Sequence, residues 1–165
     1  MTLQILKLPS IVISSLYKNC LVDLSTDEKS ATEKTAKINF LGGNGKPILF
    51  LVNNINVSFL PDNQLNFLLG ILSACKLNMA DIAIVNLSKT DNTEHKNLPE
   101  FFKAEVIILF GIEATELSLP FKIPDFQVQL FKNQKYLFTP ALDVVENDAP
   151  LKRKLWEALK NILAI

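Results

Sequence analysis

Three short apolar runs, separated by polar segments, dominate the middle of the chain. They cover residues 48–53, 82–87 and 106–110, and Gly111 ends the last of them. Runs of this length, rich in Ile, Val, Leu and Phe and bounded by turn-forming residues, predict buried β-strands. A membrane-spanning helix requires roughly 20 apolar residues, so none of these runs predicts a membrane segment.

Between and after these runs, apolar residues recur at helical spacing. Asp62 is the expected N-cap of a well-buried helix, whose apolar positions are Leu65, Phe67, Leu68, Leu69, Ile71 and Leu72. A short helix is expected around residues 99–103. Pro150 suits the first turn of a final helix, whose apolar face holds Leu151, Leu155, Leu159 and Ile162 with Trp156 beside it.

The alternation of strands and helices predicts an α/β fold. We expect three α/β/α layers, a mostly parallel central sheet, and a C-terminal helix packed on that sheet. The last third has a different pattern, because residues 126–131 and 136–138 flank the polar stretch 132–135. This arrangement predicts a hairpin or a pair of edge strands.

Residues 1–45 differ from the rest of the chain. An apolar arm led by Leu3, Leu6 and Leu8 precedes a polar linker, in which a short solvated helix is expected to end at Lys37. Glycines at positions 42, 43 and 45 predict a flexible turn. We therefore expect an arm and linker over residues 1–45 and one core domain over residues 46–165. The arm either adds a strand to its own sheet or orders on a partner.

Composition narrows the function classes. The 17 basic and 17 acidic side chains cancel, so no net field favours a phosphate backbone and direct nucleic-acid binding is not expected. Cys20 and Cys75 lack the paired spacing of a zinc or redox motif, and they predict free thiols in a reducing, cytoplasmic compartment. No cluster of metal-ligating residues and no cofactor motif is evident in the sequence.

Polar residues follow two of the expected strands, at the edge where open α/β sheets bind ligands. Asn53 and Asn54 end the first strand, and Glu113 and Glu116 follow the third. Under one hypothesis, Asn53, Asn54 and Glu113 line a ligand pocket. Under the other, the asparagines form a turn and the glutamates begin a helix. His95 is expected to be a solvated loop residue, and no catalytic residue is assigned.

The closing segment of the chain carries a resemblance to a known family. The residues concerned are Thr139-Pro140-Ala141-Leu142, Asn147, Pro150, Arg153 and Leu155-Trp156, preceded by Asn53-Asn54 and Leu109-Phe110-Gly111. With these residues, 46–163 resembles the psi subunit of bacterial DNA polymerase III. The resemblance implies a non-catalytic domain that is related in shape to uracil-DNA glycosylases and binds a chi subunit. It also implies an N-terminal arm, here Leu3, Leu6 and Leu8, that grips the clamp loader.

The sequence leaves three functions open. The first is a non-enzymatic assembly subunit with clamp-loader and chi-like partners, which an exposed apolar patch would favour. The second is a degenerate nucleotide- or base-binding domain, including an enzyme, which a concave pocket with convergent polar groups would favour. The third is a homodimer joined through a sheet edge or through the arm.

Overall fold

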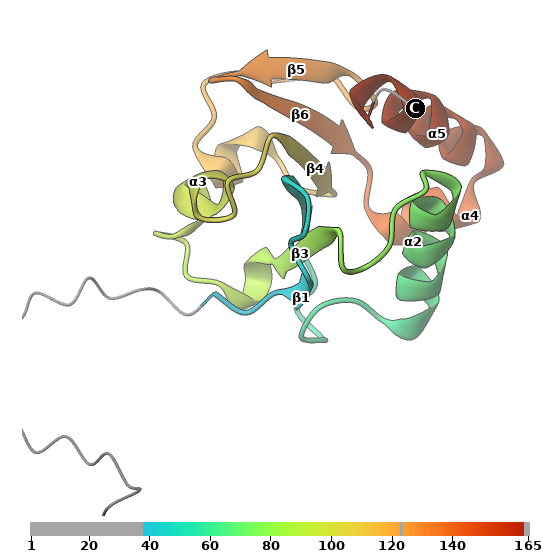
Figure 1. The fold of residues 1–165 in the computed structure, drawn as a ribbon, viewed down its shortest axis with the longest axis horizontal. Coiled ribbons are helices and arrows are strands. Elements are labelled where there is room, and N and C mark those ends of the chain that lie inside the picture. The colour runs from blue at the N-terminus through green and yellow to red at the C-terminus, as the bar shows by residue number, and fades with distance from the viewer. Residues whose placement is uncertain (1–37, 123, 164–165) are drawn as a thin grey trace, which may run out of the picture. The chain divides into compact units, whose positions relative to one another are not determined.

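The computed structural model describes residues 38–122 and 124–163 (Figure 1). The elements are β1 (Leu41–Gly42), β2 (Ile48–Val52), α2 (Asp62–Ala74), β3 (Ile82–Asn86), η1 (Leu87–Lys89), η2 (His95–Asn97), α3 (Leu98–Phe101), β4 (Val106–Phe110), η3 (Ala114–Leu117), β5 (Val128–Phe131), β6 (Gln134–Thr139), α4 (Leu142–Asn147) and α5 (Ala149–Leu163). The expected arm and the expected helix ending at Lys37 lie outside these residues. Within the described ranges, no helix is both long and apolar enough to cross a membrane.

Six strands form one mixed sheet in the order β1-β3-β2-β4-β6-β5. The four central strands are parallel, whereas β1 pairs antiparallel with β3, and β5 pairs antiparallel with β6. Every residue of β2, β3 and β4 is buried, because both faces of the sheet are covered. The predicted α/β fold with a mostly parallel sheet is confirmed, and so are the three buried strands.

Helices of different lengths cover the two faces. On one face, Phe50 and Ile108 of the sheet pack in a core with Leu72 of α2 and Leu155 of α5. On the other face, the core is closed by η1, α3 and η3, whose buried residues include Leu87, Leu98 and Leu117. In Figure 1, α2, α4 and α5 gather on one side of the sheet and α3 lies on the other. The prediction that the C-terminal helix packs on the sheet is confirmed.

The helix α2 differs from its prediction at two positions. Asp62 is the first helical residue, and Pro61 occupies the N-cap position without a side-chain cap. Leu69 is exposed, whereas Leu68 and Leu72 are buried. Successive helical residues are rotated by about 100°, so Leu69 lies beside the buried stripe and faces solvent.

The folded core begins earlier in the chain than Lys46. Ile38 is buried, and β1 pairs Leu41 with Ile84 and Gly42 with Ala83. The expected flexible turn is wrong, because the glycine segment packs closely on the chain before β3. Gly42 has a φ of +110°, and a Cβ atom there would overlap the carbonyl oxygen of Ile82. Position 42 therefore requires glycine both because its φ is positive and because the Ile82 carbonyl leaves no room for a side chain.

The predicted hairpin is confirmed as β5 and β6. Lys132 and Asn133 form its two-residue turn, with φ values of 48° and 63°. Positive φ at both positions is the geometry of a type I′ turn, whose twist matches that of the flanking strands. The hairpin places β5 at the end of the order of the described strands, next to β6.

Candidate functional site

The carboxyl ends of β2, β4 and β6 form the part of the fold best placed to bind a ligand. From β2 the chain crosses first to β3 on one side, and then to β4 on the other side of β2. In open α/β sheets, such a reversal of direction opens a crevice outside the carboxyl ends of the strands. The fold thus directs attention to residues that follow Val52 and Phe110.

A cavity of about 190 Å³ lies at this position. It is lined by Val52, Asn53, Asn54, Leu60, Gln64, Phe110, Ala141, Leu142 and Asp143. Val52, Phe110 and Leu142 are buried, whereas Asp143 is exposed and Gln64 is half-buried. The cavity is smaller than the usual 300–1,000 Å³ of a small-molecule site. It has room for a small ring or a single side chain.

Asn53 and Asn54 both line this cavity, as the pocket hypothesis requires. Asn53 is also held by protein groups, because its Nδ2 donates to Glu116 Oε2 at 3.4 Å and its Oδ1 accepts from the hydroxyl of Ser88. Asn54 Oδ1 accepts from the Asn56 N–H at 3.0 Å, which is the bond of an Asx turn. These bonds orient both amides within the protein, so the turn hypothesis accounts for them directly.

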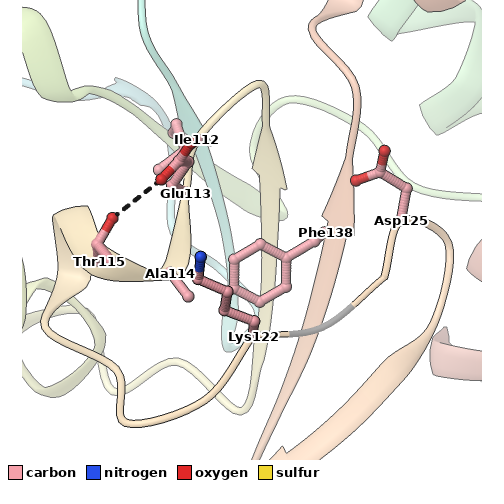
Figure 2. A pocket seen from close by; sticks show the side chains of 7 residues that line it. All are labelled: Ile112, Glu113, Ala114, Thr115, Lys122, Asp125 and Phe138. Carbon is pink, nitrogen blue, oxygen red and sulfur yellow. Dashed lines mark hydrogen bonds between the residues drawn. The ribbon is translucent and has the colours of Figure 1, made fainter.

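Glu113 lines a different cavity, of about 200 Å³ (Figure 2). Its carboxylate accepts from Thr115 Oγ1 at 3.2 Å, while its N–H donates to Glu116 Oε1 at 3.3 Å. The Glu113 carboxylate also accepts from the backbone N–H of Glu116, so the two glutamates form a capping box at the start of η3. The prediction that the two glutamates begin a helix is confirmed. In Figure 2, Asp125 lies on the other side of Phe138 from Glu113. The structure therefore brings Asn53 and Asn54 together and places Glu113 in a separate cavity.

Asn86 is the main site residue that the sequence did not reveal. It is buried at the carboxyl end of β3, and its Nδ2 donates to the carbonyls of Asn54, Val57 and Ser58 at 2.7, 3.0 and 3.2 Å. Its Oδ1 accepts from the N–H groups of Asn54 and Ser88 at 3.0 and 3.2 Å. One amide thus fixes the loop that follows β2. The signal in the sequence was a polar residue near the end of an otherwise apolar run.

His95 is buried, so its expected place in a solvated loop is wrong. Its Nε2 lies 3.2 Å from the carbonyl oxygens of both Leu87 and Thr90. The chain between β3 and α3 folds into the short helices η1 and η2 rather than an open loop, and this brings the imidazole over the last turn of η1. The ring lies within hydrogen-bond distance of both carbonyls and so helps to hold this segment together.

Other titratable groups do not add a reactive centre to the described residues. Burial raises the pKa of the Cys75 thiol, which disfavours the thiolate, so Cys75 acts as a small apolar core residue. Among residues 38–122 and 124–163, no three His, Cys, Asp or Glu side chains gather as metal ligands. Leu3, Leu6, Leu8 and Cys20 lie outside these ranges.

The sequence matches no protein-family model, and no curated protein matches it either.

Proposed function

We propose that this chain is a non-enzymatic, protein-binding assembly subunit. The observation that carries the proposal is an aromatic patch formed by Phe40, Phe101 and Phe102. Phe40 and Phe101 are 40% and 49% exposed, whereas Phe102 is buried. The ring centroid of Phe102 lies 5.1 Å from that of Phe40 and 5.0 Å from that of Phe101, with edge-to-face geometry in both pairs.

This arrangement suits a docking surface because it is already ordered before a partner arrives. Phe102 packs in the core beneath the sheet, so it anchors the two exposed rings and limits their rotation. Aromatic side chains are enriched at protein interfaces, where they remove a large apolar area from water at little cost in side-chain entropy. The partner surface would present apolar side chains to these rings.

The resemblance of residues 46–163 to the psi subunit family supports the proposal that the chain is an assembly subunit. Under this proposal the partners are clamp-loader and chi-like subunits, and the folded domain takes the chi-like subunit through the aromatic patch. The arm that contains Leu3, Leu6 and Leu8 would bind the clamp loader. With 17 basic and 17 acidic side chains, the chain has no net charge to favour direct contact with nucleic acid.

An affinity pull-down from lysate of the source organism tests the proposal. The baits are the intact chain, a Phe40→Ser/Phe101→Ser variant, and a variant that lacks residues 1–24. We expect the intact chain to retain clamp-loader and chi-like subunits. The patch variant should lose the chi-like subunit, and the truncation should lose the clamp loader. Ile55→Ser is the matched control, because Ile55 is 77% exposed and lies in the loop after β2, not among the three aromatic residues. Retention of the chi-like subunit by the patch variant would refute the docking role of the aromatic rings.

The cavity beside Asn53 and Asn54 favours a second candidate, a degenerate nucleotide- or base-binding domain. A titration of the chain with uracil, adenine and their nucleosides, followed by backbone amide NMR shifts, tests this candidate. Saturable shifts at Asn54, Gln64 and Asp143 would support it. The absence of shifts at millimolar ligand would remove it.

A further inference from the structure

Among residues 38–122 and 124–163, no strand pairs with the outer side of β5, and the surface of this edge strand is apolar. It stands at one end of the strand order, and its side chains Val128 and Leu130 are 39% and 62% exposed. Natural edge strands are usually protected by Lys, Pro or inward-pointing charges. The sequence of β5, Val-Gln-Leu-Phe, has none of these. The opposite edge, β1, has only two residues, one of which is a glycine, so it offers little backbone for another strand to pair with.

The pairing of β5 with β6 shows which backbone groups face outward. Phe131 and Gln134 close the two-residue turn and are therefore a hydrogen-bonded pair. Hydrogen-bonded and non-hydrogen-bonded pairs alternate along an antiparallel ladder, so the N–H and C=O groups of Val128 and Leu130 point away from β6. Consistent with this, the carbonyl of Leu130 accepts from the side chain of its neighbour Gln129 at 3.2 Å.

We propose that β5 pairs antiparallel with β5 of a second copy of this chain. A two-fold axis through Gln129 sets the outward groups of Val128 opposite those of Leu130 in the other copy. The two six-stranded sheets then become one continuous sheet. On the face that carries α5, the four side chains of Val128 and Leu130 from both copies form an apolar cluster. The same patch serves both subunits, as a two-fold interface requires.

Charges at the two ends of β5 favour a second copy over an unrelated peptide. Asp125 lies three residues before the strand, in the turn that leads to it, and Lys132 lies in the turn just after the strand; both are exposed. An antiparallel arrangement brings Asp125 of one copy near Lys132 of the other, and it does so at both ends of the interface. The surface is therefore complementary to itself in charge as well as in register.

The interface is small, so we expect the two copies to bind each other weakly. A four-residue strand on each side buries less area than a stable interface of standard size. We therefore expect a reversible dimer with a dissociation constant in the micromolar range or weaker. This association goes beyond the proposed docking role, because it uses the edge of the sheet opposite to Phe40 and β1.

Sedimentation velocity of the full chain, from about 5 to about 500 µM, tests the proposal, and this range spans a micromolar dissociation constant. The intact chain should shift from monomer to dimer with rising concentration. Val128→Glu/Leu130→Glu places carboxylates opposite one another and should weaken the dimer at least tenfold. Ile55→Glu, which changes an exposed apolar residue elsewhere, should leave it unchanged. Circular dichroism melts of all variants establish that they are folded.

A charge exchange tests the register itself. Lys132→Asp alone should weaken the dimer about threefold, the range of an exposed ion pair, and Asp125→Lys in the same chain should restore it. A monomer at every concentration would overturn the proposal. So would equal dimerisation by the intact chain and the double-glutamate variant. Phe40→Ser/Phe101→Ser should dimerise normally, so failure of the docking proposal and failure of this one are distinguishable.

Discussion

Asn86 is the residue on which the loop after β2 most depends. Its buried amide makes five hydrogen bonds, and four of their partners belong to residues 54–58. We expect Asn86→Ala to lower the free energy of unfolding by about 3 kcal/mol, because five part-buried hydrogen bonds to backbone carbonyl and N–H groups would be lost.

Urea unfolding of the variant measures this loss. Asn161→Ala is the matched control, because Asn161 is exposed on α5 and its truncation should change stability by less than about 0.5 kcal/mol. A loss below about 1 kcal/mol for Asn86→Ala would contradict the role of Asn86 as the anchor of the loop.

Tyr136 gives the domain a pH dependence in the alkaline range. Burial, and secondarily the carboxylate of Glu100, raises the pKa of Tyr136 above its ordinary value. Between an ordinary pKa of about 10 and the raised pKa, the folded state keeps a proton that the unfolded state releases. Stability is therefore fully present below about pH 10 and falls as the pH rises through this window.

The variant Tyr136→Phe separates this effect from packing. It should lose about 1 kcal/mol at neutral pH, because the phenol donates to Gln134 Oε1 at 2.8 Å, yet its stability should fall less steeply above about pH 10. Denaturant unfolding at a series of pH values measures both effects. Identical alkaline slopes for the two proteins would contradict the raised pKa.

At the scale of elements, we expect alanine to have opposite effects on stability at two glycine positions. Gly42→Ala should destabilise the domain by more than about 2 kcal/mol, because its φ of +110° and the carbonyl of Ile82 leave no room for a methyl group. Gly70→Ala should stabilise it by about 1 kcal/mol, because Gly70 lies in α2 and a Cβ atom there meets nothing within 4 Å.

Thermal and urea unfolding measure the stability of each glycine variant relative to the parent chain. If Gly42→Ala were as stable as the parent, the segment around β1 would not belong to the folded core.

The elements that could be predicted from the sequence are those that have a clear hydrophobic pattern within one short stretch of the chain. The strands β2, β3 and β4 are apolar along their whole length because they are buried on both faces, and α5 has a continuous apolar stripe. The strand β1 has two residues, and its place depends on contacts of Gly42 and Gly43 with residues 79–82. Such contacts join distant parts of the chain, so no local sequence pattern predicts them.

The same distinction applies to the candidate site. Asn53 and Asn54 were predictable as a pair at the carboxyl end of a strand, since strand ends follow from local hydrophobicity. The function of Asn86 depends on a loop that returns to it from β2, and the burial of His95 depends on how residues 87–97 fold. Neither is visible in the spacing of residues. Glu113 was placed correctly at a helix start, yet its separation from Asn53 required the positions of β2 and η3.

At the scale of the whole molecule, the described α/β domain has exposed apolar residues at both ends of its sheet, near β1 and on β5. We propose that the aromatic patch near β1 binds a different protein, and that β5 pairs with β5 of a second copy. A subunit with both surfaces could bring two copies of a partner together. The dimer and the docking interaction should therefore be independent, because their residues do not overlap.

The most direct test of the central claim is the binding of the purified chain to purified clamp-loader and chi-like subunits from the same source, measured by isothermal titration calorimetry. We expect the intact chain and the Ile55→Ser control to bind the chi-like subunit equally. We expect Phe40→Ser/Phe101→Ser to bind at least tenfold more weakly, because two interface aromatics contribute more than about 1 kcal/mol each. No binding by the intact chain, or equal binding by the patch variant, would contradict the account.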